Sequence, residues 1–391
     1  SNGNVEQVGT PDEVYEEPAN AWVADFLGVS NLMDGVAEGG SADGSCLYTT
    51  TRPGGLLAWD WREGRVRWRW PAADAARVRA SRDGKRLAVV RSDVWEVLIL
   101  DGATGKVQTT LDKNRQLQVE CVAFSPDGRT VATGLHAGGV YIWEAATGKF
   151  LGWLPSQGQG DVVWGIEFTP DGRHVVTASS TGPVRVWELD TMTQVFRRTD
   201  GPSSALCVSL SADGRAALAA QQRAPILWSL AAEPTGDRDR QWSDLWADPV
   251  TAYRAQWGLA GTDGLARFLR AQIGDKIPEA DAERVKRLIA ELDDASYRTR
   301  ESAGAALARL GRLVEPAVRA ALASSPSAEQ RERLDVLAAR HKGGMPPDEL
   351  RLRRAVQALR WRGDPEAKKL LAEWASGMEG APLTEAARAA I

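Results

Sequence analysis

Two pentapeptides in the sequence come close to the pattern of a loop that binds nucleotide phosphates. They are GATGK at 102–106 and AATGK at 145–149. Such a loop needs glycines at a fixed spacing and a hydroxyl residue after the lysine, which contacts magnesium. Val107 and Phe150 stand at the hydroxyl position, and the glycine spacing is wrong. Both pentapeptides therefore predict hairpin turns rather than a phosphate site.

No other recognisable motif encodes catalysis or metal binding. The cysteines Cys46, Cys121 and Cys207 are 75 and 86 residues apart, and the three histidines lie in unrelated contexts. That spacing lacks the close pairs of a metal knuckle. The sequence also lacks an HExxH motif and a serine in a GxSxG turn. We therefore expect no enzyme activity, no cofactor and no metal, and separate free thiols in a reducing compartment, the cytoplasm.

Three arginines alternate with apolar residues at the period of a β-strand. Arg65, Arg67 and Arg69 share one face, and Val66, Trp68 and Trp70 share the other face. Two interpretations are open, a solvated outer strand or a docking stripe for an acidic partner or RNA backbone, and the first is favoured. The net charge of −4 argues against nucleic acid as the general partner.

The elements that must position these residues fall into regions of different composition. Residues 1–38 contain eight acidic residues and no Lys or Arg. Residues 39–230 are rich in Gly, Thr and Val with short alternating apolar runs, whereas 243–391 have helical spacing, and 231–242 have linker composition. Strands followed by helices predict two separate domains. No run reaches the ~18 apolar residues of a membrane helix, so we expect no membrane insertion.

The strand-rich region is a repeat. A Ser/Thr-x-Asp-Gly turn recurs with its aspartates at Asp43, Asp83, Asp127, Asp171 and Asp213. Asp-Gly favours tight hairpins, and five turns at intervals of 40 to 44 residues predict repeated hairpin units. An apolar tripeptide follows each turn by 15 or 16 residues, and four of these tripeptides are centred on a Trp. This repeat accounts for four of the sixteen Trp.

This period and these motifs resemble the WD-repeat family, whose units form the four-stranded blades of a β-propeller. The resemblance implies an all-β propeller with about five recognisable blades and an incomplete ring. No unit has the Gly-His pair that opens a typical repeat, so we expect the family's His-centred hydrogen-bond network to be absent. Residues 35–40 read GVAEGG, so the first unit is expected to lack a convincing innermost strand.

Two residues of this region are candidates for binding a partner. Glu120 and Trp164 have equivalent positions near the start of the innermost strands of adjacent blades. In the WD-repeat family that rim contacts partners, so the resemblance implies this role, but simple packing or contact with water is the favoured interpretation. A propeller hydrolase or lyase would need polar residues around the central channel. The innermost strands offer mostly apolar residues and Gly, which disfavours that activity.

Residues 243–391 have the apolar spacing and the termination signals of α-helices throughout. Two sets of apolar residues recur at i, i+3, i+4 and i+7: Val285, Leu288, Ile289 and Leu292, then Ala303, Ala306, Leu307 and Leu310. Gly311 and Gly363 are helix stops, and the patterns at 300–322 and 354–371 resemble HEAT-type repeats with an insertion around 324–348. We predict an all-α HEAT-like domain. Trp242, Trp246 and Trp257 are expected to seal it against the propeller.

The first residues resemble a different family. Residues 5–37 are similar to the end of the ATPase domain of polyamine-type ABC importers, as a helix and turn. The nucleotide-binding motifs of that family lie upstream of this stretch. A natural fusion and an assembly artefact both remain open as the origin of the junction.

Two functions follow from these resemblances. The first is a non-catalytic protein–protein interaction scaffold, built from a propeller and helical repeats. The second is the regulatory C-terminal half of an ABC-importer ATPase. In either case we expect protein partners, and the open propeller edges suggest a homodimer.

Overall fold

The computed structural model describes most of the chain from residue 35 onward. The described residues are 35–40, 46–51, 55–60, 63–70, 75–91, 94–111, 118–155, 160–198, 205–220, 225–234, 236–274, 282–324, 326–339, 345–377, 379 and 381–391. The importer-like helix and turn is predicted within residues 1–38. Of these, residues 1–34 lie outside the described residues.

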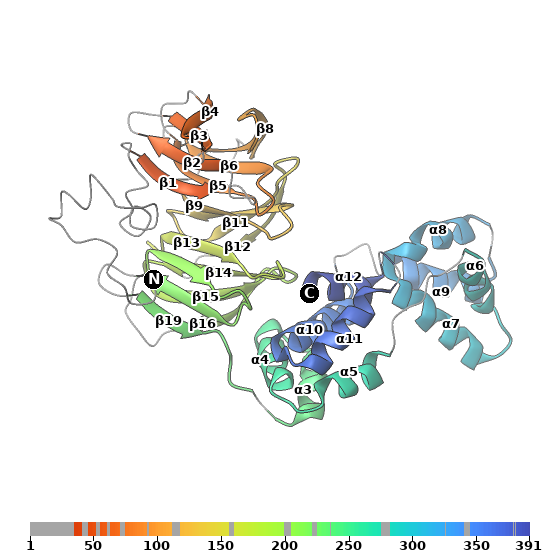
Figure 1. Cartoon of the computed structure of the whole chain (residues 1–391). Helices are drawn as coiled ribbons and strands as arrows, with labels where there is room; N and C mark the ends of the chain where they lie inside the picture. The colour runs from red at the N-terminus through yellow and green to blue at the C-terminus, as the bar shows by residue number, and fades with distance from the viewer. Residues whose placement is uncertain are drawn as a thin grey trace.

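The described strands form five antiparallel sheets in chain order (Figure 1). The first sheet contains β1 (Gly35–Gly40), β2 (Cys46–Thr51), β3 (Gly55–Asp60) and β4 (Arg65–Trp70), and the second contains β5 (Ala75–Ala80), β6 (Arg86–Arg91), β7 (Glu96–Asp101) and β8 (Val107–Thr110). The third contains β9 (Val119–Phe124), β10 (Thr130–Leu135), β11 (Val140–Glu144) and β12 (Phe150–Leu154). The fourth contains β13 (Val163–Phe168), β14 (His174–Ser179), β15 (Gly182–Glu188) and β16 (Thr193–Arg198), and the fifth contains β17 (Cys207–Leu210), β18 (Ala216–Ala220) and β19 (Pro225–Ser229). These sheets are the predicted blades, and the all-β, incomplete propeller is confirmed.

The expectation that the first unit lacks an innermost strand is wrong. β1 pairs with β2 from Gly35 opposite Thr51 to Gly40 opposite Leu47, with an irregularity between Ala37 and Gly39. The low strand propensity of Gly is overridden because the ladder is made by backbone groups, which every residue here supplies.

Four of the five predicted turns lie within the described residues, and each of these is fixed by its own side chains, whereas the first, at 41–44, lies outside them. In the third sheet Ser125 Oγ donates to Asp127 Oδ1 at 2.6 Å, and Thr130 N donates to Ser125 Oγ at 2.9 Å. Gly128 has a φ of 67°, a conformation that favours glycine. The same pattern recurs in the second, fourth and fifth sheets. The repeated motif therefore marks where the first strand of a sheet turns into the second.

Three of the four tripeptide Trp lie between neighbouring sheets. Trp143 packs with residues of the second sheet, Trp187 with the third, and Trp228 with the fourth. The indole of Trp143 also donates to Thr133 Oγ1 at 2.9 Å, and that of Trp187 to Thr177 Oγ1 at 3.1 Å. Apolar packing thus joins each sheet to the preceding one, whereas the Trp–Thr bonds connect neighbouring strands within a sheet.

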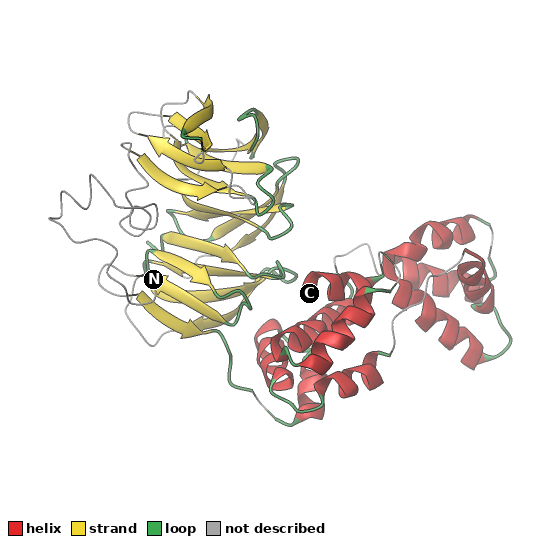
Figure 2. Ribbon diagram, in the orientation of Figure 1, coloured by secondary structure: helices red, strands yellow, loops and turns green. Residues whose placement is uncertain are grey.

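The helical region follows the strands (Figure 2). Its first group, packed around one core, contains α3 (Arg238–Asp244), α4 (Pro249–Ala260), α5 (Leu265–Ile273), α10 (Pro347–Arg362), α11 (Pro365–Ala375) and α12 (Pro382–Ala390). Its second group contains α6 (Ala282–Glu291), α7 (Tyr297–Leu310), the 3-10 helix η1 (Gly311–Val314), α8 (Glu315–Ala323) and α9 (Ala328–Ala339). The helical C-terminal region is confirmed. The domain boundaries stay predictions.

The local signals of the helical region are also confirmed. Both predicted apolar stripes lie in the core of the second group. α7 ends at Gly311, and α10 ends at Gly363, which has a φ of 65°. The expected insertion at 324–348 contains α9, whose core residues Leu334 and Leu337 are buried.

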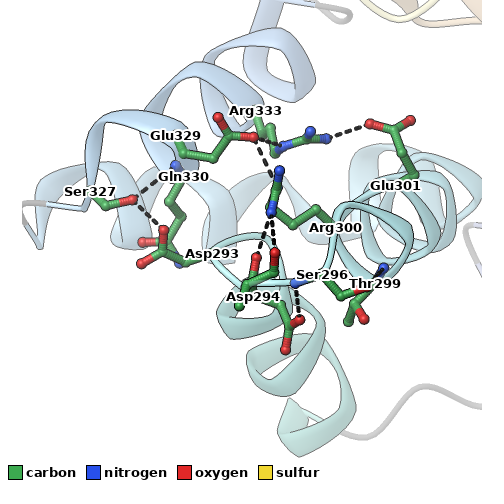
Figure 3. Close-up of polar contacts among 11 residues, drawn as sticks. Asp293, Asp294, Ser296, Thr299, Arg300, Glu301, Ser327, Glu329, Gln330 and Arg333 are labelled. Carbon is green, nitrogen blue, oxygen red and sulfur yellow. Dashed lines mark hydrogen bonds and ion pairs between the residues drawn. The ribbon is translucent and has the colours of Figure 1, made fainter.

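Polar contacts tie α9 to the turn between α6 and α7 (Figure 3). The guanidinium of Arg300 donates to Glu329 at 3.0 Å and to the carbonyl of Asp294 at 2.7 Å. Arg333 donates to Glu329 and to Glu301, each at 2.8 Å. The start of α9 therefore has a fixed position against the preceding hairpin.

We predict that the Trp–Thr bond contributes measurably to stability. Trp143→Phe leaves the buried Thr133 hydroxyl without its donor, which costs about 1 to 3 kcal/mol of unfolding free energy in urea titrations. Thr133→Val removes the orphaned group, so the double variant should lose less than the sum of the two single variants. If the losses of unfolding free energy in the two single variants add up to the loss in the double variant, the bond does not contribute to stability.

Candidate protein-interaction rim

Neighbouring strands in each sheet are antiparallel. The start of the innermost strand and the turn between the second and third strands therefore lie at the same end of the sheet. Glu120 lies at this end in β9, and Trp164 lies at the equivalent place in β13. β9 and β13 pack side by side. The structure therefore brings these two predicted residues to one rim.

Three apolar residues at the same end were missed by sequence reasoning. Leu206 stands seven residues before its turn aspartate, as Glu120 and Trp164 do, and this equal offset was the available signal. Val94 and Trp95 lie in the turn that precedes β7, and all three residues are exposed by more than 40%. We define the rim as Val94, Trp95, Glu120, His136, Trp164 and Leu206.

The acidic group of the rim is held in place. Glu120 Oε1 accepts a hydrogen bond from His136 Nδ1 at 2.8 Å and one from Gln118 Nε2 at 2.7 Å. The Glu120 side chain is 13% exposed, whereas His136 is half exposed. The rim thus combines a positioned carboxylate with exposed aromatic and aliphatic groups.

The three predicted arginines lie elsewhere, on β4, the outer strand of the first sheet. The alternation is confirmed, since the arginines of β4 are exposed and its apolar residues are half buried. Arg67 pairs with Asp60 at 2.9 Å and lowers the pKa of that carboxyl, and Arg65 pairs with Glu63 at 2.5 Å. Exposed pairs of this kind contribute little. The rim and the arginine stripe are therefore separate surfaces.

The innermost strands contain two charged groups at equivalent positions, Arg79 and Glu167, four residues before their turn aspartates. Glu167 Oε2 accepts a hydrogen bond from the backbone N–H of Leu210 at 2.7 Å, which links the fourth sheet to the fifth. Burial raises the pKa of Glu167, and this bond opposes the rise. One carboxyl held by a backbone amide is a structural link, and a general acid–base pair would need a second group within reach.

A buried ion pair fixes the helical region against the fourth sheet. Arg354 in α10 donates to both carboxylate oxygens of Glu188, from Nε at 2.8 Å and from Nη2 at 2.7 Å, and both side chains are 4% exposed. Burial would raise the pKa of Glu188, but the contacts with Arg354 hold it below its ordinary value. Sequence reasoning identified Glu188 only as the end of a tripeptide, and nothing local indicated a partner 166 residues away.

Arginine and aromatic contacts surround this ion pair. Arg173 donates to the carbonyls of Arg353 and Ala386, the latter at 3.0 Å. Trp257 stacks on Trp361 with ring centres 4.0 Å apart, within a core shared with the fourth and fifth sheets. The junction is therefore apolar at its centre and held by cationic hydrogen bonds.

The expectation that three Trp seal the two regions is right for one of them. Trp257 belongs to the shared core. Trp242 packs against the first helical group instead, and Trp246 is 51% exposed. Both lie in or after α3, which faces α4 and α10 rather than the sheets.

A histidine is buried in the junction. His174 packs edge-on to Tyr253, with ring centres 5.7 Å apart, and against Trp361 at 6.1 Å. Within the described part of the chain, neither ring nitrogen has a hydrogen-bond partner. Burial lowers the pKa of His174 below its ordinary value, so the neutral ring fits the closed junction.

Comparison with known proteins identifies the repeats. Residues 105–144 and 148–188 match the family model described as WD domain, G-beta repeat. The first range contains β8 to β11 and the second contains β12 to β15, so each match begins with the outer strand of one sheet and continues with the first three strands of the next. The chain therefore carries WD repeats in a propeller-like region, as the sequence motifs predicted.

One solved structure similar to this chain is that of the Cps50 (Swd1) β-propeller domain from Myceliophteria_thermophila. The TM-score is 0.45 at 15% sequence identity, over 52% of this chain and 69% of the other.

Three curated relatives match a short stretch of the chain. The spermidine/putrescine import ATP-binding protein PotA of Mycoplasma capricolum is 54% identical over 37 residues, and that of Acetivibrio thermocellus is 53% identical over 36 residues. The sulfate/thiosulfate import ATP-binding protein CysA of Nitrosomonas europaea is 55% identical over 42 residues. Each match covers 9 to 11% of this chain, and the chain spans about a tenth of the length of these relatives. The resemblance of the first residues to importer ATPases is confirmed at that extent.

No described helix combines the length and apolarity needed to cross a bilayer. No group of three or more His, Cys, Asp or Glu in the described ranges is arranged to hold a metal ion.

We predict that the junction weakens below neutral pH. The pKa of His174 is lowered in the folded state, so below its ordinary value of about 6.5 the unfolded chain takes up the proton more readily. Each pH unit below 6.5 should then remove up to about 1.4 kcal/mol of stability, until the folded pKa is reached.

The charged groups around His174 belong to both regions. They are Asp171, Arg173, Glu188 and Asp190 from the fourth sheet, and Arg353 and Arg354 from α10. Urea titrations at pH 7.5 and 5.5 should show the loss in the native chain and much less of it in His174→Phe, which keeps a ring in the aromatic contacts. An equal loss in both proteins would assign the effect to the carboxylates.

Proposed function

We propose that this chain is a non-catalytic protein–protein interaction scaffold whose rim binds a protein partner, in the cytoplasm. The observation that carries this proposal is the row of exposed apolar side chains on the rim, next to the positioned carboxylate of Glu120. Trp side chains supply much of the energy in protein interfaces, where they fill pockets of the partner. The WD-repeat match supports an interaction role and indicates no catalytic family.

The packing of the propeller-like region suits a scaffold. Sheets that bury apolar residues against their neighbours leave their ends available, as repeat proteins do. The junction with the helices adds a second body at a fixed position, through Glu188 and Arg354. The arginine stripe of β4 is a separate candidate for an acidic partner, and nucleic acid is not the expected ligand at a net charge of −4.

The second candidate is the regulatory C-terminal half of an ABC-importer ATPase. It is favoured by the 54% identity to PotA over 37 residues. A complete ATPase domain encoded in frame before Ser1 would support it. Another repeat unit or a stop codon in that position would eliminate it.

We also propose a homodimer through the fifth sheet. Val176 in the fourth sheet and Ala132 in the third are fully buried, whereas the equivalent Leu218 is 43% exposed. Val186 is likewise buried, but its equivalent Leu227 is 70% exposed.

A second copy is the occupant that fits this face. The opposite face of the fifth sheet is covered by the fourth sheet through Ala217 and Trp228. The first and fifth sheets lie at opposite ends of the row of sheets (Figure 1). A twofold axis would bring Leu218 and Leu227 of two copies together and bury both apolar pairs.

The rim proposal predicts selective loss of partners. Trp164→Ala combined with Leu206→Ser should weaken capture of the bound protein at least tenfold relative to the native chain, because both anchors are removed. Leu151→Ser is the matched control, since Leu151 is 48% exposed on the outer strand β12. Immobilised proteins exposed to a source lysate, followed by affinity measurement on the captured partner, provide the comparison. A partner retained equally by all three proteins would refute binding at the rim.

The homodimer proposal predicts a concentration-dependent dimer in sedimentation velocity. Leu218→Ser with Leu227→Ser should shift the protein to monomer, while Val336→Ser, an exposed apolar residue of α9, should leave the dimer intact. A native chain that stays monomeric at tens of micromolar would exclude this dimer.

A further inference from the structure

A cleft of about 250 Å³ lies where the two helical groups meet. Its walls come from α3, α5, α10 and α12 of the first group and from α7 and η1 of the second. The residues that line it include Trp242, Trp246, Ile273, Arg309, Arg351 and Leu383. The cleft is separate from the rim, which belongs to the sheets.

The guanidinium of Arg351 lies among aromatic rings in this cleft. Its central carbon is 3.6 Å from the ring centre of Trp242 and 5.0 Å from that of Trp246. Nη2 donates to the carbonyl of Trp242 at 3.3 Å, while the buried Nε has no hydrogen-bond partner in the described part of the chain. A guanidinium has five N–H donors, so most of the hydrogen-bonding capacity of Arg351 is unused.

Within the described residues, no carboxylate pairs with Arg351. Burial lowers the pKa of Arg351 to about 10 and is the cause of the shift, whereas a neighbouring carboxylate would raise the pKa. Glu349 also lines the cleft, but it accepts a hydrogen bond from Arg353 at 3.1 Å. Arg309 and Asp348 bring one charge of each sign. The charges that line the cleft therefore balance in sign, and Arg351 is the cation whose hydrogen-bonding capacity is largely unused.

Two helix starts lie at the cleft, and each helix has an acidic residue in its first turn. α10 begins after Pro346 and α12 after Ala381, and neither helix has a side-chain cap on its first N–H groups. Pro346, Pro382 and Leu383 all line the cleft. Backbone N–H groups at a helix start carry a partial positive charge and favour an anion.

The remaining walls are apolar. Trp246 is half exposed, and Ile273, Leu352 and Leu383 lie beside it. Inorganic phosphate would be a poor match, because it needs many donors and has no apolar part. A carboxylate with an apolar neighbour satisfies both the cation and the aromatic wall.

We propose that this cleft binds an acidic peptide segment of a partner protein, with a Glu or Asp carboxylate on Arg351 and an adjacent apolar side chain against Trp246. The carboxylate pairs with the unused donors of Arg351, and the apolar side chain covers the exposed indole. The proposal adds a second surface to the scaffold function proposed above. It can fail without affecting the rim, because its test uses a synthetic peptide and no rim variant.

The test is a fluorescence anisotropy titration of the full chain with two labelled peptides. One peptide contains Leu-Glu-Leu flanked by Gly and Ser, and the other contains Leu-Gln-Leu in the same frame. The native chain should bind the Glu peptide about tenfold more tightly than the Gln peptide, because the charged pair is lost in the second. Inorganic phosphate at about 10 mM should not displace the Glu peptide.

Three variants complete the design. Arg351→Gln should remove the preference for Glu, and Trp246→Ala should weaken both peptides while preserving the preference. Arg319→Gln, at an exposed position of α8, is the matched control and should behave as the native chain. Thermal unfolding of each variant separates loss of binding from loss of fold, and Trp246→Ala keeps the test decisive if Arg351→Gln unfolds.

Three results would overturn the proposal. They are equal affinity of the native chain for the two peptides, an unchanged preference in folded Arg351→Gln, and displacement of the peptide by phosphate. The last would identify a general anion site.

Discussion

The pairing of Glu188 with Arg354 is the contact on which the arrangement of the two regions depends. Both groups are almost completely buried, and their two hydrogen bonds are made in parallel. Removing one partner of such a pair leaves a buried charge without compensation, which typically costs about 3 to 5 kcal/mol. The pair also fixes an orientation, because two parallel bonds between planar groups tolerate little rotation. The position of α10 on the fourth sheet is therefore specified by geometry as well as by burial.

The sheets follow a different rule, since each depends mainly on its neighbours. Trp143 and Trp187 each pack against the preceding sheet, and the turn aspartates repeat the same local bonds. Such a series has two ends at which an apolar face lacks a successor. Leu218 and Leu227 show this at the fifth sheet. The exposed face of the fifth sheet is thus a consequence of the repeat. The rim is also a consequence of it, because each sheet presents a different side chain at an equivalent position.

The sequence was sufficient for features that depend on neighbouring residues. The four described Asp-Gly turns, the Trp tripeptides and the helix stops at Gly311 and Gly363 follow from local conformational preferences, and all are found where expected. β1 was not predictable, because its glycines have low strand propensity and the strand is held by its ladder with β2. Arg354 was equally inaccessible, since no spacing relates a residue of α10 to Glu188. At the rim, the equal offset of Glu120, Trp164 and Leu206 was readable, whereas the exposure of Trp95 depends on a turn.

A fixed junction changes what the two proposed binding surfaces can do together. The rim lies on the sheets, whereas the cleft around Arg351 lies between the helical groups. When two sites are held at one distance, a partner that spans them gains affinity through the high effective concentration of its second segment, and a partner of the wrong length gains none. Selection would then act on the separation of the sites as much as on their contacts. The buried charges of Glu188 and Arg354, which are expensive to desolvate, have a physical justification in holding that separation constant.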